Sequence, residues 1–440
     1  MKKRQLLYCG FFLSLLLGSF SCSPRLDIDD IPKNTNNLND DPYDEISQSV
    51  GFLNLWTPNN VEVTSKEVYI DSVELVLIDK EGNISLSSKT KIKGRGNSTW
   101  YSAPKKPYAL KLYKKEALLG YPSDKSWVLL ANYYDPVFLR NGIASFIGRR
   151  LSCLSFTPHF SFVNLTLNDE YKGLYQLGEK IKIGKGRVNI VDNGFILEVD
   201  GKATLSEPTF STLHLNSVIN VKDPDVTVGD EDFNWVRDYV CKAEDVLYSD
   251  SFLDEDEGYK KYFDIDTFVD WYLINEIAKN ADACMYASCF MNIQKGEKLK
   301  MGPIWDFDLA FGNYIYNLPH TVLVNSPEGF WIKDKPWFER FFLDPVFCDK
   351  IYNRFIFFFN NRDHIYEFID SQASIVQQYI AKDNAVWGRI SSEICDEKSL
   401  IDLYFKSVID LKNWIEQRFQ WMNNELLSEK GYSKYGDYSN

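Results

Sequence analysis

The pattern of apolar residues changes near residue 200, and this change constrains the fold more than any other feature of the chain. From residue 51 to about 200, short β-prone segments alternate with turns. Beyond this point apolar residues recur every three to four positions, which is the spacing of amphipathic helices. The sequence therefore predicts an α+β protein with a β-rich N-terminal lobe at residues 51–200 and a helical C-terminal lobe at residues 201–440.

The predicted elements follow from these two spacings. In the first lobe one helix is expected at residues 136–151, and strands are expected at residues 73–78, 89–93, 108–113, 160–167 and 173–177. In the second lobe a β-hairpin is expected at residues 289–301, and helices are expected at residues 233–248, 266–280, 338–360, 363–381 and 399–427.

The N-terminus has the pattern of an export signal. Residues 1–21 combine a basic start with an apolar run at 6–17, which is shorter than the roughly 20 residues of a membrane-spanning helix. The run ends before Cys22 in a pattern similar to a bacterial lipoprotein cleavage box, although Ser19 stands where an aliphatic residue is usual. The alternative is ordinary secretion without lipidation. Residues 22–50 are rich in Asp, Asn and Pro, so we expect a disordered tether.

These features predict an exported protein attached to a bacterial membrane through a lipid alone, at the outer membrane or the cell surface.

The net charge and the use of His and Cys limit the classes of function that the chain can have. Lys and Arg number 49 against 62 Asp and Glu, a net charge of −13, whereas a nucleic-acid partner requires a basic face. The four histidines are scattered without the spacing of a zinc site, and there is no C-x-x-C pair. Nucleic-acid binding, zinc hydrolysis and cysteine-protease chemistry therefore lack support.

A glycine-containing turn is expected directly after the strand at 89–93. Gly94 and Gly96 allow backbone N–H groups to approach an anion closely, and Arg95, Ser98 and Thr99 can add further donors. The turn is therefore a candidate phosphate cradle. A tight turn with a purely structural role is the alternative.

Lysines follow this turn on the next predicted strand. Lys106 and Lys111 are both placed to reach the phosphates of a nucleotide, and such a lysine needs an acidic partner to hold it. Glu179 and Glu198 are the candidate partners. The alternative is a solvated basic strand at the edge of a sheet.

Three aspartates of the second lobe are candidate functional residues. Asp282 follows the end of a predicted helix, where it could orient an acceptor hydroxyl or hold a metal; the alternative is a helix capped by Asn280 beside a solvated Asp282. Asp306 and Asp308 stand two positions apart on an expected strand between large aromatic residues. Oxygen ligands without histidine suit Mg²⁺ or Mn²⁺, and the alternative is a turn capped by one aspartate.

In this order, these segments resemble the CotH kinase family, which is named after a spore-coat protein and is related to the atypical secretory-pathway kinases. The resemblance extends over about residues 70–315. It is carried by residues 93–100, 105–111, 127–132, 139–141, 171–179, 280–282 and 304–312.

The resemblance implies a two-lobed atypical protein-kinase-like fold that uses ATP with Mg²⁺ or Mn²⁺. It implies that Asp306, with Asp308 as a possible second ligand, holds the metal and that Asp282 is the catalytic-loop aspartate. Such an enzyme would transfer the γ-phosphoryl group to Ser or Thr of an exported or surface protein. Ala287 stands where some members carry an asparagine. The alternative is therefore a catalytically inactive kinase-fold protein that binds partners at the cell surface.

Overall fold

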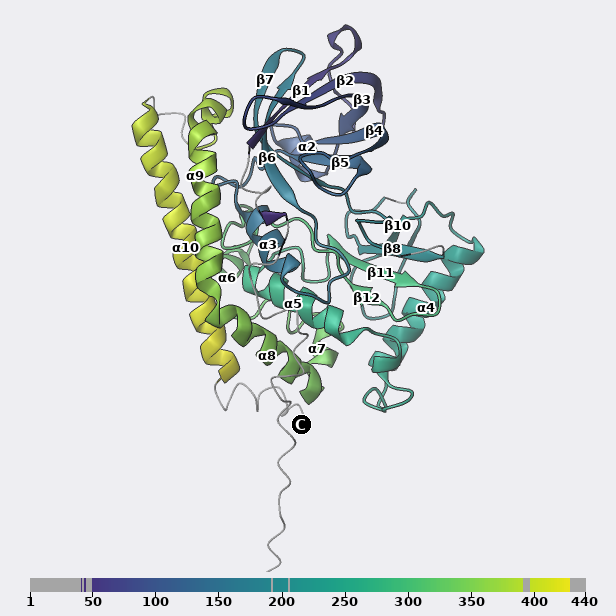
Figure 1. Ribbon diagram of the computed structural model, residues 1–440. Coiled ribbons are helices and arrows are strands. Elements are labelled where there is room, and N and C mark those ends of the chain that lie inside the picture. Colours follow the sequence, from purple (N-terminus) through teal and green to yellow (C-terminus); the bar gives the residue numbers. More distant parts are fainter. Residues whose placement is uncertain are drawn as a thin grey trace, which may run out of the picture.

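A computed structural model of the chain describes residues 41, 43, 44, 50–190, 193–204, 206–390 and 396–427. The expected signal at 1–21 and the lipidation site Cys22 lie outside these residues. The architecture is mixed α+β, with a β-barrel in the N-terminal part and a helical region in the C-terminal part (Figure 1). The predicted fold class is confirmed at this level.

Seven strands close the barrel in the order β1-β2-β3-β4-β5-β7-β6. Neighbours are antiparallel, except that β1 and β6 pair in parallel and close the barrel. Alternate side chains such as Leu53, Leu110 and Leu112 are buried in its interior. The strands are β1 (Val50–Trp56), β2 (Ile70–Ile78), β3 (Ile84–Gly94), β4 (Tyr108–Glu116), β5 (Asp124–Leu130), β6 (Phe160–Leu167) and β7 (Glu170–Glu179).

Short helices punctuate this region. A 3₁₀ helix, η3 (Pro58–Asn60), follows β1, and α2 (Ser98–Ser102) connects β3 to β4. The predicted helix at 136–151 is present as α3 (Arg140–Arg149), which lies beneath the barrel (Figure 1).

A second, antiparallel sheet has the strand order β12-β11-β8-β10-β9. The strand β8 precedes residue 200, but it pairs with β10 and β11, which follow residue 200, rather than with the barrel. The predicted hairpin at 289–301 forms β11 and β12. The strands are β8 (Gly194–Val199), β9 (Thr209–Phe210), β10 (Ile219–Asp223), β11 (Cys289–Gln294) and β12 (Lys300–Met301).

Helices make up most of the remainder. The predicted helix at 338–360 is divided in two, because Asp344 accepts a hydrogen bond from Val346 N (2.9 Å) and Pro345 starts a new helix. No helix in the described ranges is long and apolar enough to cross a membrane. The helices are α4 (Glu231–Leu247), the 3₁₀ helix η4 (Tyr259–Lys261), α5 (Ile265–Ala278), α6 (Thr321–Asn325), α7 (Phe338–Phe341), α8 (Pro345–Asn360), α9 (Arg362–Trp387) and α10 (Glu397–Leu427).

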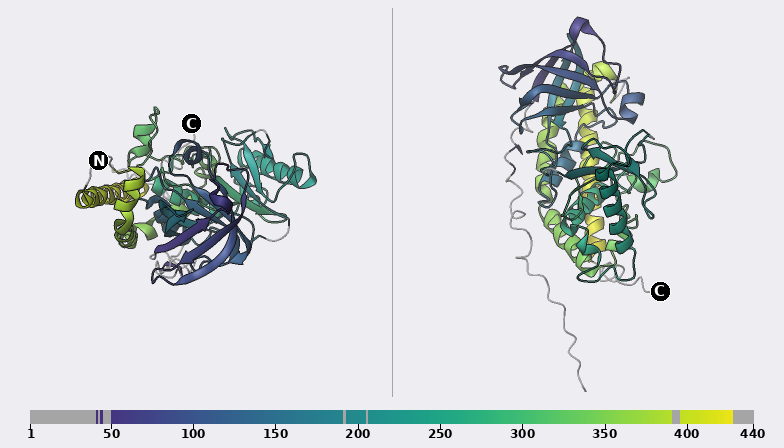
Figure 2. Two further views of the ribbon diagram at one scale, coloured as in Figure 1. Left: turned by 90° about the horizontal axis from the view of Figure 1, so that it is seen from above. Right: turned by 90° about the vertical axis from the view of Figure 1, so that its right-hand side faces the viewer.

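The long helices α9 and α10 lie side by side along one flank of the molecule (Figures 1 and 2). Near the end of α9, the buried carboxylate of Asp383 accepts hydrogen bonds from Lys105 Nζ (2.5 Å) and Leu174 N (2.8 Å). Lys105 precedes β4 and Leu174 lies in β7. The C-terminal helices therefore hold the barrel against the helical region.

Two acidic residues near the N-terminus contact the end of α3. Asp41 forms an ion pair with Arg149, and Asp44 forms ion pairs with Arg149 (3.1 Å) and Arg150. The segment expected to be a tether, residues 22–50, thus includes residues that contact the folded chain, and its last residue belongs to β1.

Candidate active site

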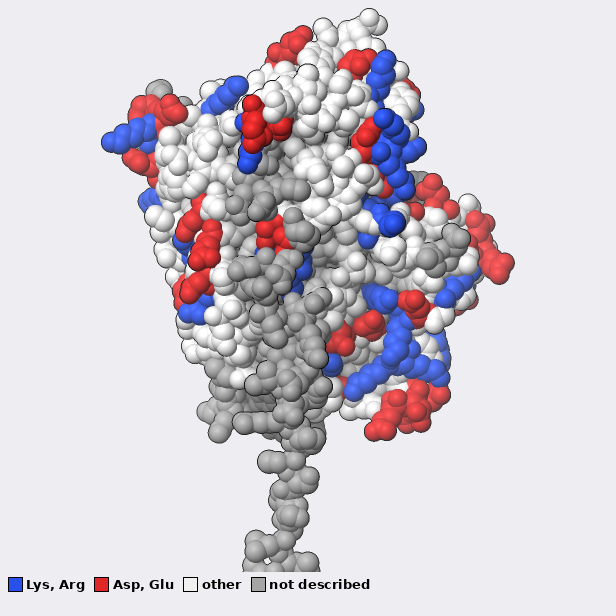
Figure 3. Space-filling model, viewed as in Figure 1, with Lys and Arg blue, Asp and Glu red and all other residues white. Residues whose placement is uncertain are grey.

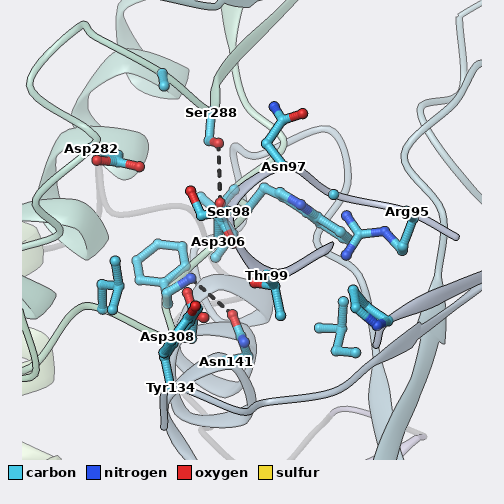
Figure 4. Close-up of a pocket in the computed structure, with 18 of the residues that line it drawn as sticks. Arg95, Asn97, Ser98, Thr99, Tyr134, Asn141, Asp282, Ser288, Asp306 and Asp308 are labelled. Atoms are coloured by element: carbon cyan, nitrogen blue, oxygen red, sulfur yellow. Dashed lines mark hydrogen bonds between the residues drawn. The ribbon is translucent and has the colours of Figure 1, made fainter. Parts of the chain in front are cut away.

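A cavity of about 540 Å³ lies between the barrel and the helical region. Its walls come from the turn after β3, the end of β5, α3, the loop after β8 and the two segments around residues 282–290 and 304–309. In Figure 4, Asp282, Asp306 and Asp308 lie on one side and Arg95 lies on the other, with Ser98 and Thr99 between them. The structure therefore brings together residues that are about 200 positions apart in the sequence.

The segment that carries Asp306 and Asp308 is not the expected strand. β12 ends at Met301, and Asp306 has a left-handed backbone conformation (φ 69°), which aspartate tolerates better than most residues. The two carboxylates therefore do not occupy alternate positions of a regular strand. Phe307 N donates a hydrogen bond to Asn141 Oδ1 (2.8 Å), which fixes the segment against α3 (Figure 4).

The start of α3 also fixes the C-terminal end of the segment that carries Asp306 and Asp308. Arg140 pairs with the buried carboxylate of Asp135 (Nη1 to Oδ1, 2.5 Å). Its Nε donates a hydrogen bond to the backbone oxygen of Ala310 (3.0 Å). Arg140 and Asn141, which belong to the segment 139–141 of the family resemblance, thus fix the backbone of the acidic segment.

The pKa values of Asp306 and Asp308 are both raised by their surroundings. The pKa of Asp306 lies above its ordinary value, first because the enclosing walls desolvate the carboxylate and second because Asp282 is near. Desolvation and the charge of Asp306 likewise raise the pKa of Asp308 well above its usual range. Arg95 and Lys202 offset this effect only partly at Asp306. A bound cation would relieve the excess of negative charge.

The donor set fits Mg²⁺ or Mn²⁺, because it consists of carboxylate oxygens. No three His, Cys, Asp or Glu side chains within the described ranges are gathered into a complete metal site. This arrangement is compatible with Mg²⁺, which proteins usually hold through one or two carboxylates together with substrate phosphates and water. Asp306 and Asp308 are the residues that fit this role.

Asp282 reaches the cavity from the loop that follows α5. Lys279 adopts the left-handed conformation that ends the helix (φ 46°), so Lys279 rather than Asn280 is the C-cap residue. Asn280 instead donates a hydrogen bond to the backbone oxygen of Asp306 (3.4 Å). Asp282 itself forms an ion pair with Lys202 (3.3 Å). The loop is thereby joined to the other acidic segment.

The glycine turn lies on the opposite side of the cavity. Gly94 packs beneath α2, where a Cβ atom would lie only 2.3 Å from the indole ring of Trp100. The guanidinium carbon of Arg95 lies 5.3 Å from the ring centroid of Trp305. The residues of the turn that line the cavity are Arg95, Gly96, Asn97, Ser98 and Thr99.

The predicted lysines do not line this cavity. Lys106 Nζ donates a hydrogen bond to the backbone oxygen of Trp100 (2.7 Å). Lys111 is exposed on β4, and basic side chains gather along this part of the barrel on the face shown in Figure 3. Neither lysine is placed by the structure beside the carboxylates.

The two predicted glutamates have other partners. Glu179 is buried, forms an ion pair with Arg187 (2.5 Å) and is hydrogen-bonded to His159 Nδ1 (2.6 Å). Glu198 lines the cavity and lies 3.4 Å from Lys222. In this structure neither glutamate is paired with Lys106 or Lys111.

Two basic residues of the cavity are not predicted from the sequence. Lys202 and Lys222 line the cavity and supply positive charge. The Asp200-Gly201 dipeptide, which follows the mostly apolar residues 195–199, is a turn signal that points to Lys202. Lys222 carries no comparable local signal, whereas Asn141, which positions the acidic segment, belongs to the segment 139–141 that carries the family resemblance.

Comparison with known proteins agrees with this arrangement. The profile of the family described as CotH kinase protein matches residues 92–422, which include both sides of the cavity and helix α9. No protein of curated function gives a significant match. The family match covers well over half of the chain. The chain therefore belongs to the CotH kinase protein family.

Proposed function

We propose that this chain is an atypical protein kinase with a two-lobed kinase-like fold. In this proposal it transfers the γ-phosphoryl group of ATP to Ser or Thr of an exported or surface protein. The observation that carries the proposal is the cavity, which sets Asp282, Asp306 and Asp308 opposite the Arg95 turn. Family membership supports it, because CotH kinase proteins are expected to use ATP.

Each side of the cavity has a role in this reaction. Asp306 and Asp308 would hold Mg²⁺ or Mn²⁺, which neutralises phosphate charge when bound. Arg95 and the backbone of the glycine turn bind phosphate oxygens. We assign the phosphate contact to Arg95 rather than to Lys106 or Lys111, because both lysines lie outside the cavity lining.

Asp282 orients the acceptor. Its carboxylate accepts a hydrogen bond from the Ser or Thr hydroxyl and so directs the oxygen toward the γ-phosphorus. It is half-buried, beside Ser288 and Tyr286 in the cavity wall, and so remains open to a ligand. Most of the rate enhancement would come from positioning and electrostatics.

The proposal includes export and attachment to a membrane through a lipid on Cys22, with residues 1–21 removed as a signal. The sequence pattern at 18–22 supports it. Radiolabelled palmitate should be incorporated into the wild-type protein in a bacterial host and not into Cys22→Ser. Equal incorporation into both proteins would exclude lipidation at this residue.

One observation favours a second function. Ala287 cannot supply the amide that some family members place there, and Ser288 Oγ lies 3.4 Å from Asp306 Oδ2 in its vicinity. A site with only one strong metal-binding segment could have lost catalysis. The chain would then be a surface protein that binds its partners without phosphorylating them.

Thermal unfolding separates the two functions. ATP with Mg²⁺ or Mn²⁺ should raise the melting temperature of the wild-type protein, and Asp306→Ala should abolish the shift. Asp410→Ala, on the exposed face of α10, serves as the matched control and should keep it. Transfer of ³²P from labelled ATP to casein as a general acceptor, or to the chain itself, should then follow the same pattern. A folded wild type without a shift in either metal would overturn the kinase proposal and favour the binding protein.

A further inference from the structure

The basic residues that line the cavity differ in the carboxylates that they contact. The described Lys and Arg residues that line it are Arg95, Lys202 and Lys222. Lys222 lies between three carboxylates, those of Glu198 (3.4 Å), Glu207 (3.5 Å) and Asp200 (3.7 Å). Arg95 lies on the side of the glycine turn. Lys202 is the lining lysine that pairs with the proposed acceptor-orienting residue, Asp282.

The backbone around Lys202 is fixed by contacts on both sides. Lys202 N donates a hydrogen bond to Asp200 Oδ1 (3.0 Å), which closes a tight turn after β8. Gly201 N donates to the backbone oxygen of Tyr286 (2.7 Å). A Cβ atom at Gly201 would lie 2.6 Å from the Tyr286 ring and 3.0 Å from its backbone oxygen. The turn is thus packed directly against the loop that carries Asp282.

The pair of Lys202 and Asp282 faces the open cavity. The side chain of Lys202 is 36% exposed and that of Asp282 is 25% exposed, at a separation of 3.3 Å. A pair this open contributes little to stability, because solvent screens its charges. Stability alone therefore gives little reason for the packed turn that delivers this lysine. An anionic ligand that enters the cavity can compete with Asp282 for the ammonium group.

We infer that Lys202 is a further catalytic residue, which binds the oxygens of the phosphoryl group during its transfer. This inference rests on the proposed kinase function. In the reaction, the acceptor oxygen forms a bond to the γ-phosphorus, and the bond between that phosphorus and the β–γ bridging oxygen breaks. ADP leaves with the electron pair, and the hydroxyl proton passes to the Asp282 carboxylate.

Lys202 keeps its protons throughout this sequence. When the phosphoryl oxygens draw the ammonium group away, Asp282 loses its ion-pair partner and becomes a better acceptor for the hydroxyl proton. The positive charge lies beside the position where negative charge is spread in the transition state. Lys202 therefore stabilises the charge on the phosphoryl group and, by leaving Asp282, also favours removal of the proton from the acceptor hydroxyl.

The test compares Lys202→Met and Lys202→Arg in the full chain with Lys412→Met. Lys412 forms a half-exposed ion pair with Asp370 (2.7 Å) on the outer helices and is a matched control. We expect Lys202→Met to lower kcat about 10²- to 10³-fold, the cost of removing one transition-state donor. The melting-temperature shift with ATP and Mg²⁺ should remain, Lys202→Arg should recover part of kcat, and Lys412→Met should match the wild type.

The outcomes distinguish this inference from the proposed function. An active wild type with Lys202→Met within threefold of its kcat would overturn the inference and leave the kinase proposal standing. A retained melting-temperature shift with ATP and Mg²⁺ shows that Lys202→Met is folded, so that a loss of kcat in this variant cannot come from unfolding. A Lys202→Arg variant that recovers none of the lost kcat would also count against the inference. A wild type without metal-dependent ATP binding would overturn the proposed function and the inference together.

Discussion

The pair of Arg140 and Asp135 offers a direct test of how the acidic segment is held in place. Arg140→Met keeps most of the side-chain volume but removes the guanidinium group. The substitution removes the ion-pair partner of the Asp135 carboxylate, whose side chain is 1% exposed, and leaves the electrostatic attraction of Arg389 as partial compensation. It also removes the hydrogen bond to the backbone oxygen of Ala310 (3.0 Å).

The expected cost follows from these contacts. Breaking a buried ion pair by removing one partner costs about 3–5 kcal/mol, because a charge stays buried without compensation. Asp135 keeps hydrogen bonds from the backbone N–H groups of Val137 (3.2 Å) and of residue 140 (2.9 Å), which places the estimate near the lower limit. With an unfolding entropy of about 2.1 cal/mol/K per residue, ~3 kcal/mol corresponds to roughly 4 °C for a domain of this size.

The assay is a double-mutant cycle in urea, with Arg140→Met, Asp135→Asn and the double variant. The double variant should be more stable than Arg140→Met, because it no longer buries an unpaired charge. Arg140→Met should also weaken the ATP and Mn²⁺ melting-temperature shift, because the segment of Asp306 loses an anchor. A free-energy change below about 1 kcal/mol, with an unchanged ligand shift, would refute this account of the segment.

Three further predictions concern other parts of the site. Burial raises the pKa of Glu198 from its ordinary 4.5 to about 7, so the folded state holds a proton that the unfolded state releases. The free energy of unfolding should therefore fall by up to about 3 kcal/mol as pH rises from 4.5 to 7. Glu198→Gln should remove this dependence in urea titrations at about pH 5 and about pH 8. Gly94→Ala places a methyl group 2.3 Å from the tryptophan ring of α2 and should cost about 1–3 kcal/mol in thermal unfolding, whereas Gly142→Ala, whose nearest contact is 3.4 Å, should cost nothing; equal effects would contradict the packing described. Arg95→Ala should raise the Kd for ATP about tenfold and Lys111→Ala should leave it within twofold, by calorimetry; the reverse order would return the phosphate contact to the lysine of β4.

The local pattern of apolar and polar residues is sufficient to predict elements that have one buried and one exposed face. The prediction at 160–167 coincides with β6, and the helices predicted at 363–381 and 399–427 lie within α9 and within α10. The strand β5 was missed, because residues 127–131 form an unbroken apolar run without alternation and are all buried. The helix expected at 338–360 was wrong in its continuity, because Asp344 and Pro345 start a new helix.

The site could be predicted where chemistry is concentrated in a short segment. Asp282, Asp306 and Asp308 were selected from sequence, and the structure places them in one cavity. The position of Lys111 depends on tertiary structure. Strand alternation turns it away from the barrel interior, but only the packing of the two regions decides whether that outer face borders the cavity.

Lys105 shows most clearly what a sequence does not reveal. Its neighbour Lys106 was the candidate, yet Lys105 is the lysine with a fully buried ammonium group. Burial lowers its pKa to about 7, and Asp383, 278 residues away in the sequence, partly offsets that effect. No local pattern connects two residues at that separation.

The contact between Lys105 and Asp383 also bears on the order in which the protein can mature. A ribosome completes the barrel strands long before it reaches α9, so the nascent barrel contains a lysine whose partner has not been made. Burying that ammonium group alone would cost several kcal/mol. The barrel can therefore reach its final packing only after the last third of the chain has been synthesised. A fragment that ends before α9 is expected to be degraded by proteases rather than to be functional.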